Sequence, residues 1–175
     1  MLRELALHIL DMVENSLNAG ATFVTIEVIE DVLADRLTMR VADNGRGMDG
    51  ELVQRVADPF FTTRTTRRVG LGLPFLKQAA EMCNGSLTID SARGVGTTIT
   101  ATFRHSHIDR MPLGDLSGTV LSLVIGNPHS DFVYRHIVNG RVFEFDTRPI
   151  RAALGEVALS EPSVIAFLKE ALKEV

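Results

Sequence analysis

Asp11 and Asn15 stand one helical turn apart in the N-terminal segment LRELALHILDMVENSLN. On a helix over residues 2–18 their side chains fall in one polar stripe, about 80° wide at 100° per residue. An asparagine oxygen is the hard, neutral ligand that magnesium accepts while it keeps water and bridges phosphates. An aspartate can accept a proton from a water molecule that attacks phosphorus. The pair therefore indicates a site for a magnesium nucleotide, with a stripe that only faces solvent as the alternative.

Glycine-rich and arginine-rich stretches follow later in the chain. VADNGRGM, residues 41–48, ends an apolar run with residues that are typical of tight turns, so it fits either a turn or a binding loop. RTTRR, residues 64–68, leaves a similar choice between a solvated loop and a phosphate clamp. VGLGL comes next, and a glycine pair before a helix lets backbone N–H groups approach phosphate oxygens. Their joint occurrence favours the binding interpretation of each.

The elements that must position these residues follow from the hydrophobic pattern. Up to residue 103 it predicts a helix (2–18), two strands (22–29 and 37–43), a short helix (50–57), a loop (58–70), a helix (71–84) and two strands (86–92 and 96–103). After a polar connection it predicts three strands (119–126, 131–138 and 141–147) and two helices (148–154 and 161–174). Asn139-Gly140 should form the hairpin turn between the last two strands. This order predicts helices packed on one face of a mixed sheet.

Five motifs occur in a defined order: D-x-x-x-N on the first helix, D-N-G-x-G-M after a strand, D-P-F-F-T-T, G-L-G-L before a helix, and G-V-G-T-T. Together they resemble the GHKL superfamily of ATP-binding domains, which includes DNA gyrase, heat-shock chaperones, sensor histidine kinases and mismatch-repair ATPases. The resemblance covers residues 5–103. VENSLNAGATFVTIEV is similar to the mismatch-repair branch, whereas DPFFTTR, VGLGLPFLKQAAE and GVGTTIT are similar to sensor histidine kinases. We therefore favour the histidine kinase-like branch.

The resemblance implies roles at the adenine. Asp43 would receive the adenine amino group, with support from Thr97. The backbone would approach the purine at Gly45 and Gly47, and the Met48 side chain would form part of the pocket wall beside the purine.

The resemblance also implies roles at the metal and the phosphates. Asn15 would bind magnesium. Asp11 stands where hydrolysing members carry a glutamate base, but aspartate is one methylene shorter, and Glu14 is a less well-placed substitute. The phosphate-facing residues would be Arg64, Gly70, Leu71 and Gly72, with arginine replacing the lysine that is common at position 64.

The expected fold is an α/β two-layer sandwich of the Bergerat type, with helices on one face of a mixed sheet. Residues 1–104 would form the ATP-binding domain, and residues 105–175 a small C-terminal α/β appendage. Fewer than about 80 residues seldom bury a core alone. We therefore expect the appendage to pack on the ATP-binding domain or on a second copy of the chain.

Composition limits the partners. The net charge of −4 gives no reason to expect nucleic acid, and the sequence contains no apolar run of the ~20 residues that a membrane span needs. The lone cysteine, Cys83, is expected in the core and favours the reducing cytoplasm. HSHID, residues 105–109, fits no strong zinc spacing, so surface or hairpin histidines are favoured over a metal site.

Three functions compete, each with ATP or ADP as a ligand and magnesium as its cofactor. The first is a protein kinase that phosphorylates another chain, because only about ten residues precede Asp11 and His8 is a poor phosphate acceptor within the ATP-binding helix. The second is an ATPase whose nucleotide state regulates a partner protein. The third is a nucleotide-sensing module without turnover. All three describe a bacterial regulator in signal transduction.

Overall fold

The computed structural model describes residues 2–58 and 72–173. Its helices are α1 (Leu5–Asn18), α2 (Gly50–Val56), α3 (Gly72–Met82), α4 (Leu116–Gly126), α5 (Thr147–Leu154) and α6 (Pro162–Ala171). Its strands are β1 (Phe23–Asp31), β2 (Arg36–Asp43), β3 (Ser86–Ala92), β4 (Gly96–Arg104), β5 (Asp131–Val138) and β6 (Arg141–Asp146).

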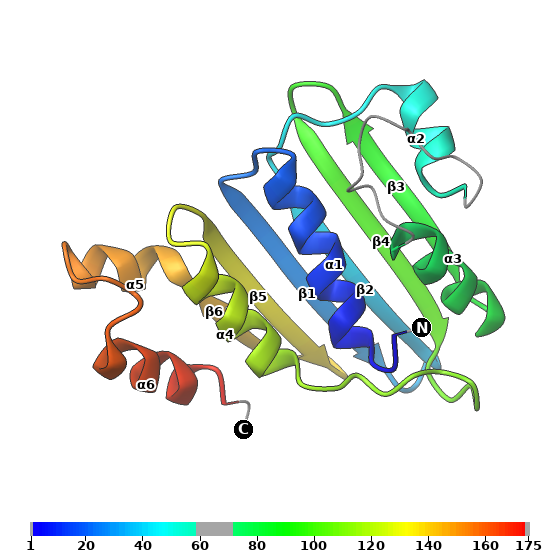
Figure 1. The fold of residues 1–175 in the computed structure, drawn as a ribbon. Helices are drawn as coiled ribbons and strands as arrows, with labels where there is room; N and C mark the ends of the chain where they lie inside the picture. Colours follow the sequence, from blue (N-terminus) through cyan, green and yellow to red (C-terminus); the bar gives the residue numbers. More distant parts are fainter. Residues whose placement is uncertain (1, 59–71, 174–175) are drawn as a thin grey trace.

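The strands of the described chain form one six-stranded sheet in the order β3-β4-β2-β1-β5-β6. Neighbouring strands pair antiparallel except β1 and β5, which run parallel with Phe23 opposite Asp131. A parallel pair needs a long crossover connection, and α4 lies in the segment that leads into β5 (Figure 1). The residues after Arg104 therefore continue the sheet that the earlier residues begin.

Alternation along β1 explains why helices cover one face of the sheet. Val24, Ile26 and Val28 are fully buried, and the residues between them are only half-buried. α1, α3 and α4 lie on the buried face (Figure 1). On α1, Leu5 and Ile9 are at most 1 % exposed, so this helix is central to the core. The predicted two-layer α/β sandwich is confirmed.

Residues 119–126, which we expected to form a strand, lie in helix α4. The side chain of Asp115 caps the helix by accepting a hydrogen bond from the Gly118 N–H at 2.8 Å. The segment TVLSLVIG is apolar nearly all round, and Leu121 and Ile125 on its other sides are half-buried, which masks the helical period. The fully buried residues nevertheless follow helical spacing: Leu116, Val120, Leu123 and Val124.

The C-terminal segment packs on the rest of the chain, as expected. β5 pairs with β1, and α4 contacts α1. The predicted hairpin turn joins β5 to β6, with positive φ at Asn139 (49°) and Gly140 (84°). The division into domains at residues 104 and 105 stays a prediction.

Two smaller expectations concern Cys83 and membranes. Cys83 is 2 % exposed and lies in the core, as predicted. Among the helices that the structure describes, none is long and apolar enough to cross a membrane.

Candidate nucleotide-binding site

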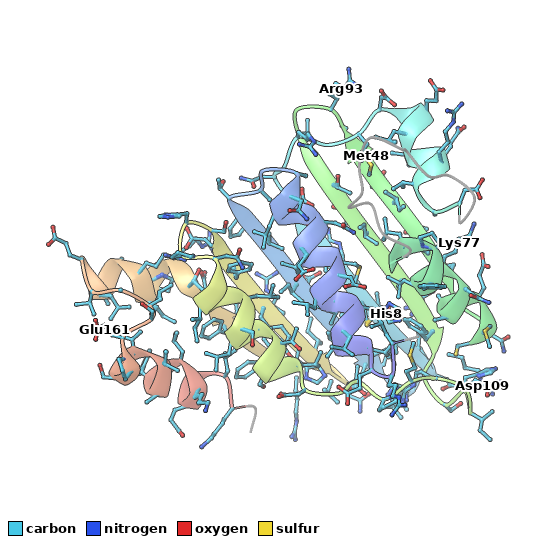
Figure 2. The ribbon with its side chains drawn as sticks, in the orientation of Figure 1. His8, Met48, Lys77, Arg93, Asp109 and Glu161 are labelled. Atoms are coloured by element: carbon cyan, nitrogen blue, oxygen red, sulfur yellow. The ribbon has the colours of Figure 1, made fainter. Side chains whose placement is uncertain are left out.

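A cavity of ≈ 200 Å³ opens between α1, the segment after β2, and β4. Apolar side chains form much of its wall, among them Met12, Met48, Leu73 and Ile99. The polar groups that reach it include Asn15, Ser16, Asp43 and Thr97. Met48 lies near the end of the sheet where the β3–β4 turn and α2 meet, as Figure 2 shows. The cavity is thus mainly apolar, with a few oriented polar groups, as small-molecule sites usually are.

The carboxylate of Asp43 is held by three donors. Its Oδ1 accepts from the Gly45 N–H at 2.8 Å and from the Thr97 N–H at 3.3 Å. Its Oδ2 accepts from the Ser16 hydroxyl at 2.6 Å. An ionised carboxylate offers about four acceptor positions. One position therefore remains for a donor that enters the cavity.

The glycines after Asp43 are required by close packing within the protein. Gly47 has φ of +67°, and a Cβ on it would lie 2.0 Å from the carbonyl oxygen of Ala92. A Cβ on Gly45 would lie 3.0 Å from both the Ala19 carbonyl oxygen and Asp43 Oδ1. The backbone after β2 therefore packs closely between the end of α1 and the β3–β4 turn. Closeness of these glycines to a purine stays a prediction.

Ser91 on β3 links the segment after β2 to β4, and both of these border the cavity. Its hydroxyl accepts from the Met48 N–H at 2.8 Å and lies 2.8 Å from Thr97 Oγ1. It also contacts the Gly96 carbonyl at 3.0 Å. We predicted roles for Met48 and Thr97 from the motifs but none for Ser91 or Ser16, because both act through contacts that are distant in sequence.

Asp11 and Gly72 meet where α3 begins. A Cβ on Gly72 would lie 3.2 Å from Asp11 Oδ2, so the first residue of α3 faces the Asp11 carboxylate. Burial raises the pKa of Asp11, and the negative charge of Glu14 raises it further. Glu14 itself is exposed. Asn15 lines the cavity one helical turn after Asp11.

The remaining predicted residues and histidines lie elsewhere. Arg64, Gly70 and Leu71 fall outside the described residues. His8 is 3 % exposed on α1, away from Met48 (Figure 2), and burial lowers its pKa. A neutral, buried imidazole agrees with its interpretation as a poor phosphate acceptor.

Two histidines at the opposite end of the sheet share one carboxylate. Glu30 lies 2.8 Å from the Nε2 atoms of both His105 and His136. Burial alone would raise the pKa of Glu30, but the two histidine hydrogen bonds outweigh it, and the pKa is lowered. Residues 2–58 and 72–173 contain no group of three or more His, Cys, Asp or Glu side chains placed to hold a metal ion.

Known proteins resemble this chain in sequence and in fold. The family described as histidine kinase-, DNA gyrase B-, and HSP90-like ATPase matches residues 2–107. The chain is 28% identical to the sensor histidine kinase YvrG of Bacillus subtilis over 98 residues, which are 54% of this chain and 17% of that protein. It is 34% identical to the sensor protein kinase WalK of Staphylococcus haemolyticus over 95 residues, which are 51% of this chain and 16% of that protein. The chain thus spans less than a fifth of the length of either relative.

A solved structure shares the fold. The ATPase domain of Aquifex aeolicus MutL, complexed with ADP, superposes with a TM-score of 0.51 at 18% identity, over 98% of this chain and 69% of that one. At this identity the similarity shows the fold alone. The kinase relatives match the histidine kinase-like branch that the motifs favour.

Proposed function

Because the chain belongs to the family of histidine kinase-, DNA gyrase B- and HSP90-like ATPases, we propose that its cavity binds ATP and ADP through the carboxylate of Asp43. The observation that carries this proposal is the remaining acceptor position on Asp43 beside apolar walls. Adenine is flat and largely apolar, and its amino group is a donor. Thr97, Gly45 and Ser16 would hold the carboxylate in place, while Met48 would pack against the ring.

Magnesium fits the donor set near α3. Asn15 would supply one neutral oxygen, and magnesium commonly takes one or two protein ligands with the rest from phosphates and water. When bound, magnesium would neutralise phosphate charge. The first turn of α3 at Gly72, together with Arg64, Gly70 and Leu71, would lie toward the phosphates.

We propose transfer of phosphate to another protein chain as the activity, in the cytoplasm. The names of the relatives support a kinase, since both are sensor kinases. Asp11 supports a proton-accepting role, because its raised pKa makes it a better base than an exposed aspartate.

Slow hydrolysis that switches a partner's binding is the second candidate. The position of Asp11 beside the start of α3 favours it, because a water molecule near the phosphates would meet a carboxylate there. In that function the same side chain would accept a proton from water instead of from a protein hydroxyl or imidazole.

Incubation of the full chain with γ-labelled ATP separates the candidates. The chain is incubated alone and with cytosolic extract, with Asp43→Asn as the control. A labelled foreign protein supports the kinase, and free phosphate supports the ATPase. Nucleotide binding without either product leaves a sensing module, and no binding contradicts the whole proposal.

A further inference from the structure

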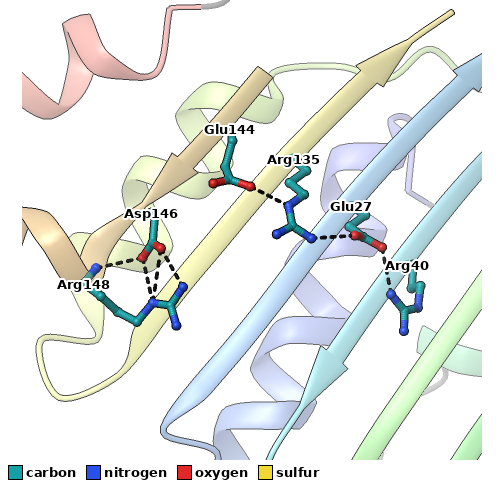
Figure 3. Close-up of polar contacts among 6 residues, drawn as sticks. All are labelled: Glu27, Arg40, Arg135, Glu144, Asp146 and Arg148. Carbon is teal, nitrogen blue, oxygen red and sulfur yellow. Dashed lines mark hydrogen bonds and ion pairs between the residues drawn. The ribbon is translucent and has the colours of Figure 1, made fainter. Parts of the chain in front are cut away.

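Four charged side chains form a row across the face of the sheet opposite α1. The row runs from Glu144 on β6 through Arg135 on β5 and Glu27 on β1 to Arg40 on β2, as Figure 3 shows. These residues are direct partners in strand register. The contacts measure 2.6 Å from Arg135 to Glu144, 3.2 Å from Arg135 to Glu27, and 2.8 Å from Arg40 to Glu27. Charge therefore alternates along four adjacent strands.

The two ends of the row differ from its middle. Glu27 and Arg135 each contact two opposite charges, whereas Arg40 and Glu144 each contact one within the described chain. Both end side chains are open to solvent, with 43% of Arg40 and 47% of Glu144 exposed; of the two middle residues, Arg135 is 40% exposed and Glu27 is 13% exposed. Each end thus carries a charge that is only partly neutralised.

We propose that this face binds a second copy of the chain in a two-fold symmetric dimer. An alternating row with an even number of charges is complementary to its own reverse. A two-fold axis parallel to the strands, between β1 and β5, places Arg40 against Glu144 of the partner subunit and Glu144 against the partner's Arg40. Glu27 and Arg135 face each other across the axis in the same way. The two partly neutralised ends therefore neutralise one another.

The neighbouring row on the same face is apolar on three of its four strands, with Thr38 as its member on β2. Ile29, Ile137 and Val142 are direct partners on β1, β5 and β6, and 61% of Val142 is exposed. The same axis brings Ile29 against Ile137 of the partner subunit. This contact adds burial of apolar surface to the matched charges.

The expected dimer is weak and sensitive to salt. Four strands spaced about 4.8 Å apart, over roughly seven residues each, offer on the order of 500 Å² per copy. That area lies at the low end for specific interfaces. Exposed ion pairs weaken as salt shortens the screening length. The nucleotide cavity opens on the helical side, so dimerisation does not depend on the proposed function.

Sedimentation velocity of the full chain tests the proposal. We expect concentration-dependent dimerisation at about 0.05 M salt that weakens at about 1 M salt. Arg40→Glu or Glu144→Arg alone should weaken it by at least about tenfold, because each change places like charges across the axis twice. The double variant should restore dimerisation to within about threefold of the parent.

The double variant separates contacts between copies from contacts within one copy. It leaves like charges beside Glu27 and Arg135 inside each subunit, so its melting temperature should stay at or below those of the single variants. Asp90→Arg reverses an exposed charge on β3, outside the four strands, and should leave association unchanged. A monomeric parent, a double variant that stays monomeric, or an Asp90→Arg variant that weakens association equally would each overturn the proposal.

Discussion

Replacement of Asp43 by Asn tests the candidate site most sharply, because the change is nearly isosteric. The amide oxygen can keep the N–H bonds from Gly45 and Thr97, at 2.8 and 3.3 Å. The amide NH₂ then replaces Oδ2, and the Ser16 hydroxyl can turn its hydrogen toward the Met12 carbonyl, 3.3 Å away. The fold should therefore tolerate the substitution.

Asp43→Asn should, however, weaken the binding of adenine nucleotides. The free acceptor position becomes a donor, so the adenine amino group loses its partner. A hydrogen bond to a charged group contributes about 1.5–3 kcal/mol. The dissociation constant for ADP should therefore rise by about 10- to 150-fold.

Isothermal titration calorimetry with ADP and inosine diphosphate measures this effect. Inosine carries a carbonyl where adenine carries the amino group, and an amide NH₂ can donate to it. The parent should prefer ADP, and Asp43→Asn should narrow or reverse that preference. Unchanged ADP affinity, or an unchanged ratio between the two nucleotides in a variant that melts normally, would refute the assignment of Asp43.

Four further altered chains have expected outcomes. Asn15→Ala should abolish the magnesium dependence of ADP affinity and leave adenosine affinity within about threefold, measured by calorimetry with and without magnesium. If Asp11 is the base, Asp11→Asn should lower phosphate release by about 10²–10⁴-fold at unchanged ATP affinity. Because the pKa of Asp11 is raised, its ionisation opposes folding, so this variant should also be more stable than the parent at pH 7. Denaturant melts should show this stability difference close as the pH falls through the raised pKa to 3.8. Because the pKa of Glu30 is lowered, Glu30→Gln should be less stable than the parent at neutral pH, with the gap lost as pH falls from 4.5 through the lowered pKa. A chain that ends at Arg104 should still bind ADP but melt at a lower temperature, since it lacks the β1–β5 ladder and the α1–α4 contact.

The motif-bearing half of the fold was predictable because its signals are local. Alternation identified β1 and β2, and the glycine and asparagine residues of VADNGRGM located the turn after β2. Helix α4 was missed because its apolar residues surround the helix, so a strand and a buried helix look alike in the sequence. The parallel pairing of β1 with β5 was not predicted either, since no short-range signal specifies which edge a later strand joins.

In the candidate site, too, the residues inside motifs were predictable, and the residues that act through distant contacts were not. Asp43 and Asn15 stand inside motifs and line the same cavity. Their roles at adenine and magnesium stay predictions. The Ser16 hydroxyl bonds to Asp43 over 27 positions, and Ser91 reaches Met48 over 43. Such contacts depend on the packing of α1 and β3 around the end of β2, and residue types alone do not reveal them.

A crystal structure of the full chain with a non-hydrolysable ATP analogue and magnesium tests the central claim most directly. The measurement is the distance from the adenine amino nitrogen to the Asp43 carboxylate. We predict a hydrogen bond of about 2.7–3.2 Å, with the ring against Met48. An analogue bound with its adenine outside the cavity, or turned so that Asp43 receives no donor from it, would contradict the account.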